Sequence, residues 1–280
     1  MKFRTEVPGP NRASDFELRR AALQALLIEG PALKCDAVRQ LQGDSAVDTE
    51  ASLPVPAKLP GRPARPELVP PAKVPRRSMA TEDGRACLLH ALAHIEFNAI
   101  NLALDIVWRF PGMPEPFYRD WYTVAYEEAE HFSMLARRLN EMGYSYGDFP
   151  AHNGLWEMAE KTCHDILARI ALVPRTLEAR GLDVSPAIRQ RLLQAGDEQS
   201  AALLDIILRD EVGHVAIGNH WYKWLCERRN LEPVATYEEL SQRYRAPRLR
   251  GPFNLDARRQ AGFDDRELEA LQRMAGNTEA

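Results

Sequence analysis

The chain contains two Glu-x-x-His motifs, at 128–131 and at 211–214, and each lies in the middle of a long stretch with helical periodicity. A single glutamate precedes each motif by almost the same distance, Glu96 by 32 residues and Glu178 by 33. Residues three apart lie on one face of a helix, so each motif presents a carboxylate and an imidazole together. The repeated spacing therefore predicts that half of a metal site is encoded twice.

Most of the candidate ligands interrupt helix faces that are otherwise apolar. Glu96 shares its face with Leu92, Ile100 and Ala103, and both motifs lie on similar apolar rows. A buried carboxylate is costly, so proteins keep one inside only beside a partner or a metal. Two Glu-x-x-His pairs with two further glutamates are the ligand set of a dinuclear centre inside a four-helix bundle. The candidate metal ligands, which are also the candidate catalytic residues, are Glu96, Glu128, His131, Glu178, Glu211 and His214.

The make-up of this ligand set predicts the metal. Four carboxylates with only two imidazoles suit iron or manganese better than zinc or copper. Two iron ions are expected, with manganese or a mixed iron–manganese pair as alternatives. Glu127 and Glu130 fall off the apolar face and are expected to be ordinary solvated acids, or at most neighbours of the ligands, and Asp210 is expected to point away from its apolar face. Aspartate and asparagine side chains can orient imidazoles through their second nitrogen, and the sequence leaves open which residues do so.

Helical periodicity runs through most of the chain, and no convincing strand pattern interrupts it. The expected fold class is all-α, a four-helix bundle with long helices at 81–110, 116–142, 154–180 and 186–229. At about 3.3 to 3.6 Å per residue, the segment 143–153 is long enough to travel the length of a bundle as a crossover. Three parts are expected: N-terminal helices with a proline-rich connector at 1–80, the metal-binding bundle at 81–229, and a C-terminal helical extension at 230–280 that packs on the bundle.

The N-terminal part has two distinct segments. Residues 14–42 have helical spacing that is broken at Gly30 and Pro31, which predicts two short helices. Residues 54–75 contain too many prolines to continue a helix. They are expected to be extended, either laid across the surface or acting as a stiff connector.

Glu178 fits the metal site less simply than the other candidates. It lies close to Gly181, where the third long helix is expected to end. If the next helix began there, Glu211 would lie about 26 residues, or about 39 Å, past the turn, and the two levels would not match. A break near Gly196, with a short helix before it, would bring Glu178 and Glu211 to matching levels.

Charge and composition exclude some functions. The net charge of −4 and the pI near 6.0 provide no global basic field, so nucleic-acid binding is not expected. No apolar run is expected to reach the roughly 20 residues that span a bilayer, and the first ten residues lack an apolar signal core. A cytoplasmic protein without membrane contact is expected. The four cysteines form no Cys-x-x-Cys pair, which is typical of reduced thiols.

Five stretches of the chain resemble a known family. They are HALAHIEFNAINLALD at 90–105, YEEAEHF at 126–132, LVPRTLEARGLD at 172–183, ILRDEVGHVAIGNHW at 207–221 and GPFNLDARRQAGF at 251–263. By these strings the chain resembles the ferritin-like superfamily, and in detail an uncharacterised bacterial branch labelled domain of unknown function 455. In ligand spacing it is also similar to the di-iron hydroxylases that act on methylthio-isopentenyl adenosine in bacterial tRNA. The resemblance implies the same six ligands, but the proline-rich stretch and the tail have no counterpart in those hydroxylases, so their substrate is not carried over.

The function expected from such a site is O₂-dependent oxidation. Two reduced iron ions react with O₂, and the protein controls access to the resulting oxidant. The chain is therefore expected to be a hydroxylase or oxidase of a small molecule or a modified nucleoside, with an unidentified electron donor. Iron handling without an organic substrate, such as ferroxidation or peroxide removal, is one alternative. The other is a non-catalytic helical interaction protein whose buried acids pair with Arg85, Arg137, Arg169 or Arg175.

The C-terminal extension carries a basic segment. Arg243, Arg245, Arg248 and Arg250 lie close together in the sequence just before 251–254, and Arg258 and Arg259 can extend the segment. One hypothesis is that this segment covers the mouth of the metal site and holds an anionic group such as phosphate. The alternative is a solvated basic surface.

Overall fold

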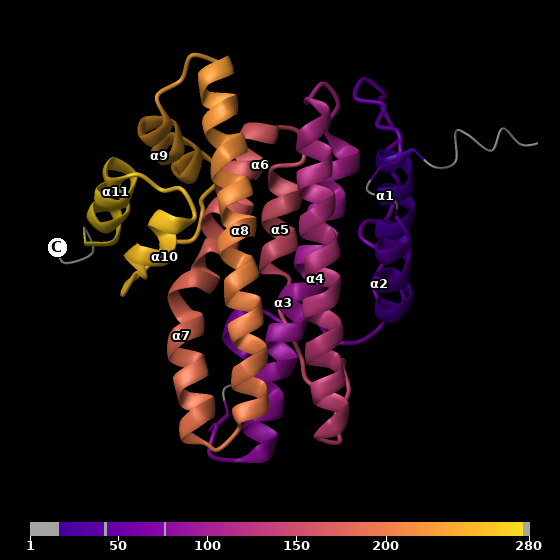
Figure 1. Ribbon diagram of the computed structural model, residues 1–280, viewed down its shortest axis with the longest axis vertical. Helices are drawn as coiled ribbons and strands as arrows, with labels where there is room; N and C mark the ends of the chain where they lie inside the picture. The colour runs from indigo at the N-terminus through magenta and orange to yellow at the C-terminus, as the bar shows by residue number, and fades with distance from the viewer. Residues whose placement is uncertain (1–16, 42–43, 76, 277–280) are drawn as a thin grey trace, which may run out of the picture.

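The long helical stretches of the sequence form four rods that lie side by side (Figure 1). The structure, a computed structural model, describes residues 17–41, 44–75 and 77–276. Three rods are single helices: α3 (Glu82–Arg109), α4 (Glu115–Glu141) and α8 (Glu198–Arg228). The other, called the composite rod here, joins α6 (Ile166–Leu172), the π-helical turn η2 (Val173–Glu178) and α7 (Ala179–Gln194). Within the described residues the fold is all-α, with a single isolated β-bridge and no strand.

Local capping chemistry sets the ends of these rods. The side chain of Thr81 accepts a hydrogen bond from the first turn of α3, and the side chain of Asp197 does so at the start of α8. Gly143 and Gly196 follow α4 and α7 with φ of 78° and 75°, a left-handed conformation that glycine adopts without a Cβ penalty. The predicted bounds of the first two long helices are confirmed to within one residue.

The third rod differs from the predicted helix over 154–180. Residues at its predicted start form a separate short helix, α5 (Gly154–Lys161), and the composite rod begins only after Asp165, whose side chain accepts a hydrogen bond from Leu167 N at 3.0 Å. The prediction that this rod ends at Gly181 is wrong, because α7 continues to Gln194. The predicted break near Gly196 is confirmed, so the fourth long helix begins there and not at residue 186.

Proline does not end α7 because a neighbouring segment takes over its lost hydrogen bond. Pro186 lies inside the helix and has no N–H to offer to the carbonyl of Leu182. That carbonyl instead accepts a hydrogen bond from Asn254 Nδ2 at 3.2 Å. A contact from the C-terminal extension therefore supports a helix that the local sequence alone would interrupt.

A second proline changes the helix type in the middle of the composite rod. Pro174 also lacks the N–H that an α-helix needs, and the chain widens into the π-helical turn η2 around it. Thr176 Oγ1 donates a hydrogen bond to Ala171 O at 2.7 Å and so satisfies one of the displaced carbonyls. Such π-helical turns are frequent at functional sites, and this one ends at Glu178.

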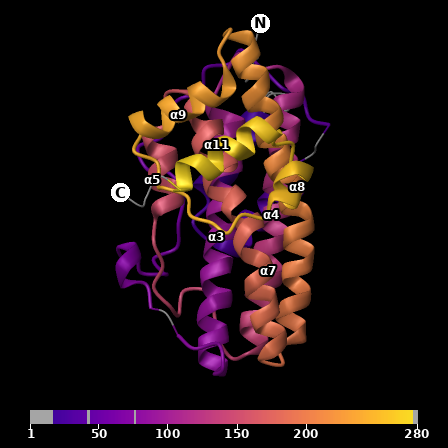
Figure 2. The ribbon, with the colours of Figure 1, turned by 90° about the vertical axis from the view of Figure 1, so that its left-hand side faces the viewer.

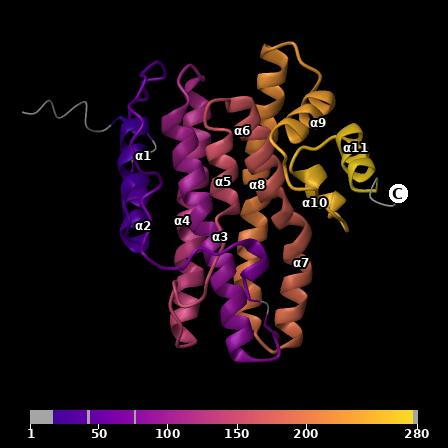
Figure 3. The same cartoon turned by 180° about the vertical axis from the view of Figure 1, so that it is seen from behind.

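The connection from α4 to the composite rod travels back along the rods (Figure 3). Residues 142–153 leave the end of α4, and α5 continues in the same direction toward the start of α6. As a result, α4 and the composite rod run parallel, whereas α3 with α4 and α7 with α8 are antiparallel neighbours joined by short turns. The expected crossover is present, and it contains a helix that the sequence analysis assigned elsewhere.

The N-terminal segments pack against α3 and α4 (Figure 1). The two predicted short helices are confirmed as α1 (Leu18–Leu27) and α2 (Pro31–Gln40). The proline-rich stretch contains only the short 3-10 turn η1 (Pro71–Lys73) and otherwise runs as non-helical chain. Part of it pairs with the crossover, where Val69 N donates a hydrogen bond to Ala151 O at 2.8 Å.

The C-terminal extension covers the outer side of α7 and α8 (Figure 2). It consists of α9 (Pro233–Arg243), α10 (Leu255–Gln260) and α11 (Asp265–Gly276). A small apolar cluster joins it to the rods, with Phe263 and Leu268 of the extension packed with Leu182 and Val215. The extension therefore lies against the half of the protein that carries the second motif.

Helix α3 corrects the prediction that the chain contains no apolar run long enough to span a membrane. Among the described helices, α3 is long and apolar enough by itself to cross a membrane, so the expectation that no such run exists is wrong. However, 78% of its most apolar window is buried inside the protein. This burial is typical of the core helix of a folded domain.

We predict that Lys34 is a main attachment point of the N-terminal helices. Its buried Nζ donates hydrogen bonds to Leu26 O and Gly61 O, both at 2.9 Å, and to Asn101 Oδ1 on α3. Lys34→Ala leaves these acceptors without a donor and opens a cavity, so the free energy of unfolding should fall by about 2 to 4 kcal/mol. Urea unfolding followed by circular dichroism measures this change. The exposed Lys58→Ala is the control, and an equal effect of the two substitutions would contradict the prediction.

Candidate metal centre

The structure brings the predicted ligand residues together between the four rods. Each rod contributes at least one carboxylate, and two rods also contribute an imidazole. The contributions are Glu96 from α3, Glu128 and His131 from α4, Glu178 from η2, and Glu211 and His214 from α8. The two motifs face each other, since the His131 and His214 ring centroids are 5.8 Å apart.

Five of the six side chains lie within a few ångströms of one another. One possible ligand atom from each of Glu96, Glu128, His131 and Glu211 falls within 4.8 Å of the other three. His131 Nδ1 lies 3.5 Å from Glu96 Oε2 and 3.5 Å from Glu128 Oε2. His214 Nδ1 lies 3.0 Å from Glu128 Oε1 and 3.6 Å from Glu211 Oε1. The two oxygens of Glu128 therefore face different imidazoles, which places this carboxylate at the middle of the cluster.

Glu178 faces the same interior but forms no ion pair with the other five residues in the described part of the chain. Its Oε2 is buried and has no hydrogen-bond partner there. Burial raises the pKa of Glu178 well above its usual value, and the negative charges of Glu128 and Glu211 raise it further. The Glu178 carboxyl group thus lies close enough to Glu128 and Glu211 to interact with their charges.

The level of Glu178 follows from the true extent of the composite rod. Glu178 is 16 residues before Gln194, the end of α7, which corresponds to about 24 Å. Glu211 is 14 residues after Asp197, the N-cap of α8, or about 21 Å. The two glutamates therefore lie at similar heights, and the mismatch in level considered from the sequence does not arise.

Buried polar atoms without hydrogen-bond partners concentrate at this cluster. Such atoms are rare in folded proteins and call for a specific explanation. Each of the six candidate ligands has at least one: Glu96 Oε2, both Oε atoms of Glu128, His131 Nδ1, Glu178 Oε2, Glu211 Oε2 and His214 Nδ1. These atoms point into one interior region, and a pair of divalent cations with carboxylate and imidazole ligands would satisfy them.

The arginines considered as alternative partners lie elsewhere. Arg85 pairs with Asp197 at 3.5 Å, Arg169 pairs with Asp105, and Arg175 pairs with Glu267. Among the described residues, no arginine or lysine nitrogen lies within 4.0 Å of the carboxylates of the cluster, whose recorded ion pairs are all with histidine. The hypothesis that arginines neutralise the buried acids is therefore wrong for this part of the chain.

Two acids outside the predicted ligand set accept hydrogen bonds from Nε2 of the two imidazoles. Glu127 Oε2 accepts a hydrogen bond from His214 Nε2 at 2.7 Å, and Asp210 Oδ2 accepts one from His131 Nε2 at 3.1 Å. Each acid lies on the rod opposite its histidine, so the bonds cross between α4 and α8. With Nε2–H donated outward, Nδ1 of each ring points inward with the lone pair that a metal ligand needs.

Of the two alternatives expected for Glu127, a solvated acid or a neighbour of the ligands, the hydrogen bond to His214 shows the second, and the expectation that Asp210 points elsewhere is wrong. A signal was available in the sequence. Each acid directly precedes the glutamate of its motif, so the repeated unit is an acidic residue followed by Glu-x-x-His. Glu127 and Asp210 do lie off the apolar faces of their own helices, but the side chain of each reaches across to the facing helix.

The electrostatics of the cluster follow from burial and crowding. Burial raises the pKa of Glu96 well above its usual value, and the Glu128 charge adds to this shift. Burial alone would raise the pKa of Glu128 too, but the adjacent imidazoles of His131 and His214 outweigh it and lower that pKa. Burial would lower the pKa of His131, but its contacts with Glu128 and Glu96 outweigh burial and raise it to about 11. In the absence of metal, the cluster therefore retains protons at neutral pH.

The fold and this cluster define the class to which the chain belongs: an all-helical protein with a buried group of glutamates and histidines that can bind metal. It is a member of the family described as Protein of unknown function (DUF455), which matches residues 27–269. The chain is 53% identical over 214 residues to a Haemophilus influenzae protein named Uncharacterized protein, and the match covers 74% of each chain. No solved structure matches the chain.

We predict that Glu127 and Asp210 increase the affinity of the site for metal without binding the metal themselves. Removing the charge behind a coordinating imidazole lets the ring turn and makes it a weaker ligand, so Glu127→Gln and Asp210→Asn should each weaken Mn²⁺ or Fe²⁺ binding by about 10- to 100-fold. Titration with metal under anaerobic conditions measures the affinity. Glu227→Gln, an exposed acid on α8, is the control. Wild-type affinity in both test variants would contradict the assignment.

We also predict that metal binding releases protons. His131, whose pKa is raised to about 11, holds a proton at pH 7 that must leave before its Nδ1 can bind metal, and the raised pKa values of Glu96 and Glu178 act in the same direction. The apparent affinity for Mn²⁺ should therefore rise as the pH increases from about 6 to about 8. Calorimetry in buffers with different ionisation enthalpies counts the released protons. Binding heats that do not depend on the buffer would refute this prediction.

Proposed function

We propose that the chain is a ferritin-like dinuclear metal protein, and that it catalyses O₂-dependent oxidation of an organic substrate. The observation that carries this proposal is the group of five buried side chains and the half-buried Glu178, each of which has a buried oxygen or nitrogen without a hydrogen-bond partner. No arginine or lysine of the described residues neutralises them. A pair of iron ions accounts for both the charge and the unpartnered atoms.

The arrangement of the rods supports the ferritin-like assignment. In that architecture a long crossover joins the second and third helices, and the ligands are one glutamate from each of two helices with a Glu-x-x-His pair from each of the other two. The chain has α5 within a long connection between α4 and the composite rod, and it distributes its candidate ligands in the same way.

The six candidate ligands would be shared between two ions. Glu96 and His131 would hold one ion, and Glu178 and His214 the other. Glu128 would lie between them, because its two oxygens already face the two imidazoles, and Glu211 would complete the set. When bound, reduced iron would supply the electrons that activate O₂ for oxidation of the substrate.

The protein surrounding the site would control water and protons. The neighbouring core side chains Phe97, Trp121, Val124 and Phe132 are almost completely buried, so the cluster lies in a largely dry region. Charges interact strongly in such surroundings. Glu127 and Asp210 would keep Nε2 of each imidazole protonated and its Nδ1 aimed inward. We propose a small molecule or a modified nucleoside as the substrate, with O₂ and a separate electron donor.

We predict that the purified chain binds two iron ions and consumes O₂ when a reductant is supplied. Glu128→Gln removes the carboxylate between the two imidazoles, so it should leave fewer than two ions per chain and reduce O₂ consumption by at least about 100-fold. Metal analysis by mass spectrometry and an oxygen electrode measure the two quantities. The variant Glu227→Gln should match the wild type.

The outcomes of this experiment separate the alternatives. A wild-type chain that holds no metal after reconstitution would overturn the proposal. Oxygen uptake that stops once the bound iron is oxidised, with no organic substrate that sustains it, would indicate iron handling. Sustained uptake that depends on one compound in a substrate screen would support the oxidase or hydroxylase.

A further inference from the structure

A second cavity lies in the C-terminal extension, away from the metal centre. It encloses about 410 Å³ between α9, the segment 245–249 and α11, and none of the six candidate ligands lines it. This volume is in the range of sites for small organic ligands. Figure 2 shows α9 and α11 side by side on the outer face of the rods. The proposal below does not depend on the metal centre.

The walls of this cavity have two chemical characters. Leu249, Leu271 and Met274 provide an apolar side. Arg245 and Arg248 also line it, and within the described residues neither guanidinium group has an ion-pair partner. Apolar walls with a few polar groups that fix orientation are typical of ligand sites.

The absence of partners distinguishes these two residues from most arginines of the same extension. Arg243 pairs with Glu239, Arg258 with Asp183, Arg259 with Asp256 and Asp265, Arg266 with Glu232, and Arg273 with Glu238. Arg250 also has no partner in the described residues, but it does not line the cavity. Arg245 and Arg248 are exposed, and in an acidic protein of net charge −4 they place positive charge without a protein partner at this cavity, which suits an anion.

The backbone at Arg245 supports a role for its side chain. Arg245 follows the C-cap of α9 with φ of 51°, in the left-handed region. Four other helices of the chain end in the same way, and there the residue is Gly143, Gly196, Asn230 or Gly262. Glycine and asparagine are the residues that this position favours, so an arginine is an unfavourable choice for the backbone. A binding role for the guanidinium group explains why the position holds arginine.

A buried hydroxyl completes the polar side. Ser241 Oγ is buried, has no hydrogen-bond partner among the described residues, and belongs to a residue that lines the cavity. A hydroxyl can donate to an anionic oxygen, and two arginines can bind the same group through charge-assisted hydrogen bonds. Among the described residues, the lining of the cavity therefore offers guanidinium donors and no carboxylate.

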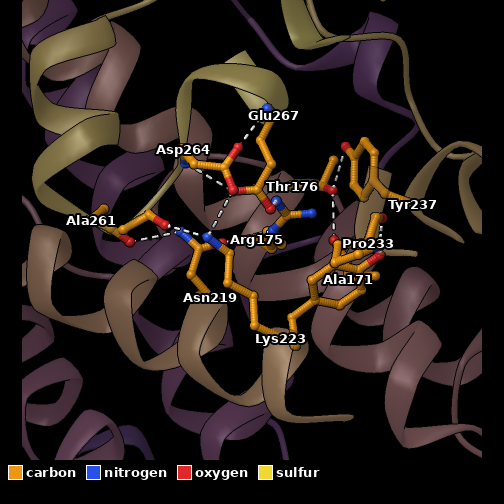
Figure 4. A network of polar contacts seen from close by, with 12 residues as sticks. Ala171, Arg175, Thr176, Asn219, Lys223, Pro233, Tyr237, Ala261, Asp264 and Glu267 are labelled. Atoms are coloured by element: carbon orange, nitrogen blue, oxygen red, sulfur yellow. Dashed lines mark hydrogen bonds and ion pairs between the residues drawn. The ribbon is translucent and has the colours of Figure 1, made fainter. Parts of the chain in front are cut away.

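A network of polar contacts adjoins the cavity at Tyr237 (Figure 4). Tyr237 lines the cavity and shares a 2.9 Å hydrogen bond with Thr176 of η2. Next to it, Arg175 forms a buried ion pair with Glu267 and donates a hydrogen bond to Asn219 Oδ1 at 2.7 Å. Because these groups satisfy one another, they are not available to a ligand, and the open donors are those nearer the surface.

We propose that the cavity binds a small amphipathic anion, with a carboxylate or phosphate group on Arg245 and Arg248 and an apolar body against Leu249, Leu271 and Met274. The sequence hypothesis that the basic segment covers the mouth of the metal centre is replaced by this one. The two arginines line a cavity formed by the extension itself.

Calorimetric titration of the full chain with octanoate and with octyl phosphate tests the proposal. Octanol lacks the charge and inorganic phosphate lacks the apolar body, so both should bind at least about tenfold more weakly than the better amphipathic anion. Comparison of the two anions shows which head group the site prefers. Binding of octanol as tight as that of either anion, or no binding of either anion, would overturn the proposal.

Variants of the arginines separate binding from folding. Arg245→Gly removes the guanidinium group and at the same time supplies the residue that the left-handed backbone favours. It should weaken anion binding by at least about tenfold while the melting temperature stays the same or rises. Arg248→Gln should weaken binding similarly, and Arg243→Gln, whose arginine pairs with Glu239, should bind as the wild type does. Unchanged binding in both Arg245→Gly and Arg248→Gln would refute the site.

Discussion

The rest of the structure depends on the burial of four carboxyl groups beside two imidazoles. Each buried carboxylate raises the cost of ionising its neighbours, and no arginine or lysine of the described residues offsets that cost. A site of this kind persists only if the surrounding helices bury enough apolar surface to hold it. The long rods supply that surface, and the terminal extensions cover their outer sides. The structure is therefore organised to keep a highly charged centre away from water.

The π-helical turn η2 connects the two sides of the composite rod. Toward the interior it ends at Glu178, which extends the carboxylate cluster. Toward the outside it presents Arg175, which pairs with Glu267 and bonds Asn219, and Thr176, which bonds Tyr237 (Figure 4). Because both sets of contacts belong to one turn, the packing of the C-terminal extension and the position of Glu178 are mechanically linked. The extension thus contacts the same turn that carries Glu178.

The hydrogen bonds behind the imidazoles cross between the two motifs. Glu127 on α4 holds His214 on α8, and Asp210 on α8 holds His131 on α4. Neither helix orients its own histidine, so the geometry of each half depends on the other. This reciprocity explains how a repeated sequence element produces a single centre. It also explains why these acids were not recognised from one helix at a time, although the repeated position before each motif contained the information.

The sequence by itself determined the local features of this protein. Helical periodicity and capping residues predicted the all-α class and the bounds of α3 and α4, and the spacing within each motif placed Glu128 with His131 on one face. Only the tertiary structure decided that α7 continues through Gly181 and Pro186, where Asn254 supplies a hydrogen bond from a distant segment. It also decided the level of Glu178 and the cavity at Arg245. The physical reason is that periodicity is a property of neighbouring residues, whereas contacts between helices depend on how distant segments pack.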